Sequence, residues 1–99
     1  MKVYIAGRIS GVPDYWHPFG RAEQQLHDQG FVVLNPARLP EGMSKADYMR
    51  VCLAMIDSAD IVALLPGWET SPGARLEADY CQYICKPVNT VDNILRAHL

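Results

Sequence analysis

Residues 60–77 read DIVALLPGWETSPGARLE, and this stretch determines which fold the chain can adopt. The apolar run from Asp60 to Leu65 predicts a buried strand, and the proline at position 72 predicts the start of a helix that runs to Cys85. A glycine-containing loop connects the two. A buried strand that enters a helix through a short loop is the repeating unit of parallel α/β sheets.

The same alternation continues outward in both directions. We expect further strands at Lys2 to Ala6, Phe31 to Leu34 and Pro87 to Val91, and further helices at Pro18 to Gln29, Ser44 to Ser58 and Asp92 to His98. Because the strands are nearly continuous apolar runs, helices should cover both faces of the sheet through right-handed crossovers. We therefore predict a flavodoxin-like (Rossmann-like) α/β three-layer sandwich with a small parallel sheet in the order 2-1-3-4. Residues 1–99 should form this one domain.

The amino-acid composition argues against some classes of binding partner. Of the 99 residues, 49% are hydrophobic and 20% are charged, and the net charge is −2, which leaves no basic footprint for duplex nucleic acid or an anionic membrane. The sequence has no signal-peptide or membrane-span pattern, so we expect a cytoplasmic protein. The cysteines are odd in number and lack zinc-ligand spacing, so we expect buried thiols at Cys52, Cys81 and Cys85, with no metal and no cofactor.

The expected helix at 44–58 carries apolar residues on more than one stripe. They are Tyr48, Met49, Val51, Cys52, Leu53, Met55 and Ile56. The sheet can cover one stripe, and a second surface is needed for the rest. We therefore expect a homodimer or a larger homo-oligomer.

Glu77 is the residue that points most directly to function. It shares one face of its helix with Gly73, Ala74, Tyr80, Cys81 and Ile84, whereas Arg75, Asp79, Gln82 and Lys86 should occupy the solvated face. A carboxylate on the apolar stripe loses hydration, which costs free energy unless chemistry or a partner uses its charge. Two roles fit: a reactive carboxylate, or the structural partner of a buried arginine or tyrosine.

Two glycine-containing loops should meet beside Glu77. Ligands of parallel sheets bind beyond the carboxyl ends of the strands, where the loops 7–11 and 66–73 begin. Glycines let a ligand approach the backbone, an arginine supplies a forked cation, and a helix start offers N–H groups to an anion. We assign substrate binding to Gly7, Arg8, Ser10, Gly11, Trp68, Ser71 and Gly73, with Trp16 as a second tryptophan that could stack on a base.

Three segments resemble one family. The YIAG-x-x-SG start at 4–11, the SADIV segment at 58–62 and the SPGARLE segment at 71–77 look like the nucleoside 2-deoxyribosyltransferase superfamily, which includes 2′-deoxynucleoside 5′-monophosphate N-glycosidases. The resemblance implies that Glu77 is the nucleophile that attacks C1′ of the sugar, with Tyr4 beside it as a second catalytic residue. It also implies that Ser71 contacts a 5′-phosphate.

Two positions depart from the family pattern. Cys52 stands where relatives have an aspartate that positions the ligand and supplies protons, and Arg8 stands where relatives often have a small residue or proline. Three hypotheses therefore remain open. The chain is a hydrolase or transferase acting on a nucleoside or nucleotide, a nucleotide-binding module without turnover, or a structural flavodoxin-like interaction domain in which Glu77 is an ion-pair partner.

Overall fold

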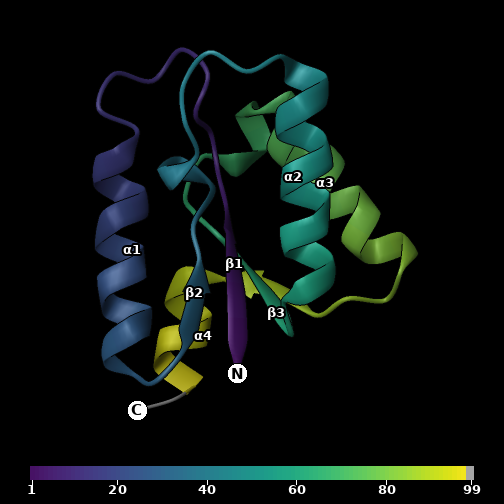
Figure 1. Cartoon of the computed structure of the whole chain (residues 1–99). Helices are drawn as coiled ribbons and strands as arrows, with labels where there is room; N and C mark the ends of the chain where they lie inside the picture. The colour runs from purple at the N-terminus through teal and green to yellow at the C-terminus, as the bar shows by residue number, and fades with distance from the viewer. Residues whose placement is uncertain (98–99) are drawn as a thin grey trace.

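The computed structural model describes residues 1–97 and contains a four-stranded parallel sheet in the order β2-β1-β3-β4 (Figure 1). The strands are β1 (Lys2–Ala6), β2 (Val32–Leu34), β3 (Ile61–Leu64) and β4 (Val88–Thr90). The α-helices are α1 (Trp16–Asp28), α2 (Lys45–Ser58), α3 (Pro72–Tyr83) and α4 (Val91–Ala97), and two 3-10 turns lie at Pro36–Arg38 and Trp68–Thr70. The predicted flavodoxin-like fold and strand order are confirmed.

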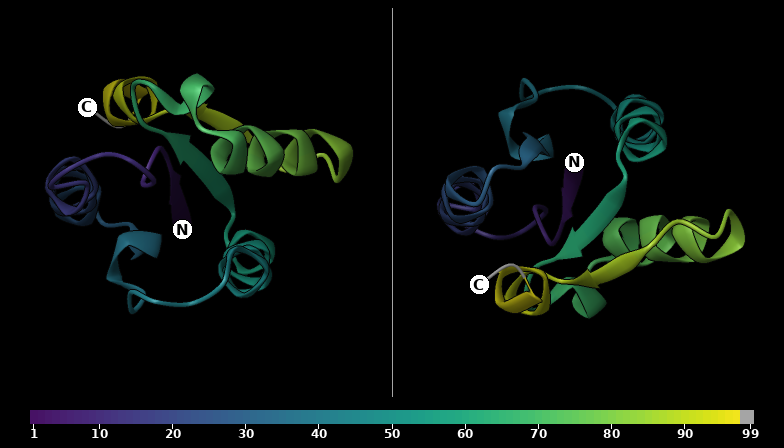
Figure 2. Two further views of the ribbon diagram at one scale, coloured as in Figure 1. Left: turned by 90° about the horizontal axis from the view of Figure 1, so that it is seen from above. Right: turned by 90° about the horizontal axis from the view of Figure 1, so that it is seen from below.

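Two hydrophobic clusters place the helices in two layers, one on each side of the sheet (Figure 2). On one side, Phe19, Ala22 and Leu26 of α1 and Ile94 of α4 pack against alternate strand residues. The other side is built from α2 and α3, and its members are Tyr4, Ala6, Cys52, Ile56, Ala59, Val62, Leu64 and Cys81. Successive strand residues point to opposite faces, so Tyr4 faces α2 and α3 while its neighbours face α1.

The helix starts follow the side-chain chemistry of the sequence. Ser44 caps α2 by accepting a hydrogen bond from the Asp47 amide over 3.1 Å, and Ser71 caps α3 by accepting one from the Ala74 amide over 3.1 Å. Each cap satisfies one of the amides left over at a helix start. Pro72 follows directly as the first residue of α3, where its missing N–H costs nothing.

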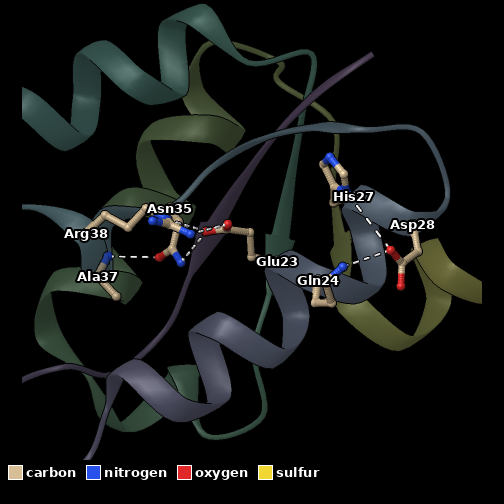
Figure 3. A network of polar contacts seen from close by, with 7 residues as sticks. All are labelled: Glu23, Gln24, His27, Asp28, Asn35, Ala37 and Arg38. Carbon is tan, nitrogen blue, oxygen red and sulfur yellow. Dashed lines mark hydrogen bonds and ion pairs between the residues drawn. The ribbon is translucent and has the colours of Figure 1, made fainter.

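A polar network holds the segment after β2 against α1 (Figure 3). Glu23 accepts hydrogen bonds from the Asn35 amide group over 2.9 Å and from the Arg38 guanidinium over 2.8 and 2.6 Å. The Asn35 side-chain oxygen in turn accepts from the Ala37 amide. Hydrogen bonding from Arg38 holds the pKa of Glu23 below its usual value. This network fixes the β2 edge of the carboxyl end of the sheet.

The end of α3 differs from the prediction. The helix ends at Tyr83 rather than at Cys85, because Cys85 has a left-handed backbone (φ 59°) that an α-helix cannot include. Cys85 is exposed, which corrects the expectation of three buried thiols, and Ile84 is exposed as well. Lys86 lies partly buried rather than on a solvated face, and its ammonium donates to the Ala59 carbonyl.

Two further differences concern α2 and α4. In α2 only Cys52 and Ile56 are fully buried, so the other apolar residues form a partly exposed surface and the predicted homo-oligomer stays a prediction. The last helix begins at Val91, one residue before the expected start, and the predicted end at His98 lies outside the described residues.

Candidate active site

The structure brings Tyr4 and Glu77 into direct contact between the sheet and α3. The Tyr4 hydroxyl donates a hydrogen bond to Oε1 of Glu77 over 3.1 Å, across 73 positions of sequence. Tyr4 is 1% exposed and Glu77 is 7% exposed, so both are withdrawn from bulk water. Tyr4 sits in the centre of β1, and Glu77 lies in the second turn of α3. Both groups are therefore held by regular secondary structure rather than by loops.

The electrostatics of Glu77 follow from burial. Loss of hydration raises the pKa of Glu77 to about 7, although hydrogen bonds from Tyr4 and Cys52 partly offset the rise. Among residues 1–97 no ion pair involves Glu77, since the three salt bridges lie elsewhere on the surface. The lack of a cation argues against a structural ion pair, whereas the hydrogen bond to buried Tyr4 fits both a reactive carboxylate and the structural partner of a buried tyrosine.

Cys52 completes this cluster from α2. Its thiol interacts with both Tyr4 and Glu77, and burial and the Glu77 charge raise the pKa of Cys52. Burial and the nearby Glu77 carboxyl likewise raise the pKa of Tyr4. Cys81, one turn after Glu77, has its pKa raised to about 11 by burial. The position that departs from the family pattern thus lies in contact with the candidate nucleophile.

The two loops at the carboxyl end meet as predicted. The Arg8 guanidinium donates to the Thr70 hydroxyl over 3.3 Å and to the Ser10 carbonyl over 3.2 Å. Thr70 lies within the loop 66–73 that was expected at the site, although it was not among the residues assigned to substrate binding. Ser71 accepts a hydrogen bond as the helix cap, so its hydroxyl can still donate a hydrogen bond to a ligand. Gly73 follows on the same turn and is partly buried.

The glycines of the first loop have different roles. At Gly7 a side chain would meet Leu65 at 2.9 Å and Phe19 at 3.1 Å, so packing of the loop on the core requires this glycine. That packing is a reason for Gly7 that the sequence analysis did not predict. Gly11 has a left-handed backbone (φ 74°), which lets the chain turn beside the Arg8 guanidinium.

The two tryptophans lie in different environments. Trp68 is partly buried and packs on the cluster that contains Tyr4 and Cys52. Trp16 is 55% exposed at the start of α1, where its ring stacks on His17 with centroids 4.6 Å apart. Of the two tryptophans, Trp68 is therefore the one that packs near Tyr4 and Cys52.

Two shallow hollows open at the carboxyl end of the sheet. One lies between α1 and α4, and the other lies between the Trp68 turn and α4. The second is lined on its polar side by Glu69, Thr90, Asp92, Asn93 and Arg96. Residues 90–96 carry no motif and reach this edge through the crossover after β4, so the sequence alone does not place α4 beside a hollow.

No group of three or more histidine, cysteine, aspartate or glutamate side chains within residues 1–97 is arranged to hold a metal ion. Within the same range, no helix combines the length and the apolar character needed to cross a membrane.

Comparison with solved structures defines the class of the fold. The chain superposes on a 2-deoxyribosyltransferase from the psychrotolerant bacterium Bacillus psychrosaccharolyticus with a TM-score of 0.69 and 25% identity, over 89% of this chain and 69% of that one. That enzyme is described as a suitable biocatalyst for the synthesis of antiviral and antitumoral nucleosides. The resemblance to the deoxyribosyltransferase superfamily is thereby confirmed.

Residues 1–90 match a protein family described as Domain of unknown function (DUF4406). The chain belongs to this family. No curated protein matches its sequence.

Proposed function

We propose that the chain is a deoxyribosyltransferase-like N-glycosidase that cleaves the N-glycosidic bond of a (deoxy)nucleoside 5′-monophosphate. The observation that carries this proposal is the buried contact between Tyr4 and Glu77, to which residues 1–97 bring no cation. In the proposed reaction Glu77 attacks C1′ of the sugar, the base departs, and water then resolves the glycosyl ester. Tyr4 holds one carboxylate oxygen so that the other is free to attack.

The two loops supply the proposed phosphate site. Arg8 offers a guanidinium that exposed partners now occupy, and Ser71 offers a hydroxyl at the start of α3. Each can be directed to a 5′-phosphate without disturbing the core beneath. The test is chromatographic detection of free base from a panel of ribo- and deoxyribonucleoside monophosphates. Absence of release from every member of the panel would refute an enzymatic role.

A nucleotide-binding module without turnover is the second candidate. It is favoured by Cys52, which places a thiol where relatives have a carboxylate. A thiol with a raised pKa is a poor substitute for that carboxylate at neutral pH. Ligand-induced thermal stabilisation without base release would support this candidate.

Arg8→Ala is expected to weaken binding of the monophosphate by roughly 1.5 to 3 kcal/mol, because a hydrogen bond to a charged group contributes about this much binding free energy. Binding of the unphosphorylated nucleoside should barely change. Titration calorimetry on both ligands measures the difference. Arg50→Ala is a matched control, since Arg50 is an exposed arginine on α2 that pairs only with Asp47 in the structure described. Equal losses for nucleotide and nucleoside would contradict a phosphate role for Arg8.

Cys52→Asp is expected to raise the turnover of slow base release by at least tenfold with little change in affinity, because a proton donor acts in the transition state. The new carboxyl should also lower stability, since it joins Glu77 in a desolvated site. Cys52→Asn is the control, because it has the same shape and cannot ionise. A folded Asp variant that turns over no faster than the Asn variant would show that position 52 does not limit the chemistry.

A further inference from the structure

The proton donors beside Glu77 are the Tyr4 hydroxyl and the Cys52 thiol. The Tyr4 hydroxyl donates to Oε1 of Glu77, and the Cys52 thiol interacts with the same carboxyl. Both donors are buried in the cluster beneath the loops. The Tyr4 proton therefore stabilises the attacking carboxylate and is not presented to a departing base, and the raised pKa of Cys52 makes its thiol a weak acid. Within residues 1–97, Glu77 and Tyr4 thus form a nucleophile site whose cluster contains no separate carboxylic acid.

Asp57 and Glu69 are two carboxyls that flank this cluster in sequence and have other surroundings. Asp57 is exposed and accepts a hydrogen bond from the Tyr80 hydroxyl over 2.7 Å. Glu69 is exposed and lines the hollow between the Trp68 turn and α4. Neither is held in the buried cluster with Tyr4 and Cys52.

That hollow has the character of a site for a cationic ring. Trp68 lines the hollow as an aromatic wall and also packs on the hydrophobic cluster that contains Tyr4, whereas Tyr4 and Glu77 do not line the hollow themselves. Glu69 and Asp92 supply two carboxylates, while the one cation in the lining, Arg96, is directed at the Asp92 carbonyl. An aromatic face flanked by carboxylates attracts a positively charged ring.

We propose that the preferred substrates are nucleotides whose base carries a positive charge, such as pyridinium or N7-alkylated purine nucleotides. This inference rests on the proposed N-glycosidase function. A bond from Glu77 to C1′ forms as the bond from C1′ to the ring nitrogen breaks. The electron pair moves into the ring and neutralises its charge, so the base leaves without a proton. Water then adds to C1′, the ester bond breaks to restore the carboxylate, and the proton of water passes to solvent.

The test compares pairs of related nucleotides in which the base of one member is positively charged and the base of the other is not. One pair is nicotinamide mononucleotide and its reduced, uncharged form. The other is 7-methylguanosine 5′-monophosphate and guanosine 5′-monophosphate, with both in ribose and 2′-deoxyribose forms. Base release is followed by chromatography after subtraction of the rate without protein.

We expect release from the charged member to exceed that from the uncharged one by at least 100-fold. The Cys52→Asp variant should narrow this ratio by tenfold or more, because a general acid assists mainly the uncharged base. Trp68→Ala should raise KM for the charged member alone. Equal rates for charged and uncharged members would overturn this inference and leave the N-glycosidase intact. No release from any nucleotide would refute the proposed function, and this inference with it.

Discussion

Replacing Glu77 by glutamine is expected to reduce base release by at least 1,000-fold while nucleotide binding stays within a few-fold of the parent. Glutamine has the same shape and can still accept the hydrogen bond from Tyr4, but it cannot attack C1′ as an anion. Base release and equilibrium binding should be measured on the same preparation. Glu41→Gln is a matched control, because Glu41 is exposed and contacts only the Tyr15 hydroxyl in the structure described.

Other results for Glu77→Gln would favour the hypotheses in which Glu77 is not a nucleophile. Retained activity would remove Glu77 from the chemistry. A large loss of stability in the glutamine variant, with no activity in the parent, would instead indicate a structural carboxylate, because loss of one partner from a buried charge pair costs about 3 to 5 kcal/mol. The absence of any salt bridge to Glu77 within residues 1–97 argues against that result.

The stability of the same variant should depend on pH in a defined direction. Burial raises the pKa of Glu77 from 4.5 to about 7, so between these values the folded protein binds more protons than the unfolded chain. The contribution of Glu77 is fully present below about pH 4.5 and is lost as the pH rises through about 7. This difference corresponds to about 3 kcal/mol. Glu77→Gln removes the titration, and its stability relative to the parent should therefore rise by that amount from pH 4 to pH 8.

Urea unfolding of parent and variant at several pH values between 4 and 8 measures this difference. Carboxyls with lowered pKa, such as Glu23 and Asp60, titrate in both proteins and cancel in the comparison. The same ionisation should govern catalysis, so kcat/KM of the parent should rise with pH and level off above about 7. A constant stability difference across the range would contradict a desolvated Glu77.

Much of this arrangement could be predicted from the sequence because it depends on local periodicity. The burial of Glu77 follows from its spacing along α3, and the caps at Ser44 and Ser71 follow from side-chain chemistry. The meeting of the loops at Arg8 follows from the parallel order of the strands.

The remaining features depend on contacts between distant segments. The 3.6-residue period cannot show where α3 ends, so Cys85 and Lys86 were placed on the wrong surfaces. The packing reason for Gly7 depends on Leu65 and Phe19, which are far from it in sequence. The hollow beside Trp68 depends on the crossover that brings α4 back to the sheet edge.

The division between rigid and loop-borne parts of the site has a consequence for how such a protein can diverge. Tyr4 and Glu77 are positioned by a central strand and a helix, and their separation is set by the packing of α3 on the sheet. The groups proposed to meet phosphate and base, including Arg8 and Trp68, lie on connecting segments that tolerate insertion and exchange. Substrate range could therefore drift through loop replacement among descendants while the reacting pair stays fixed.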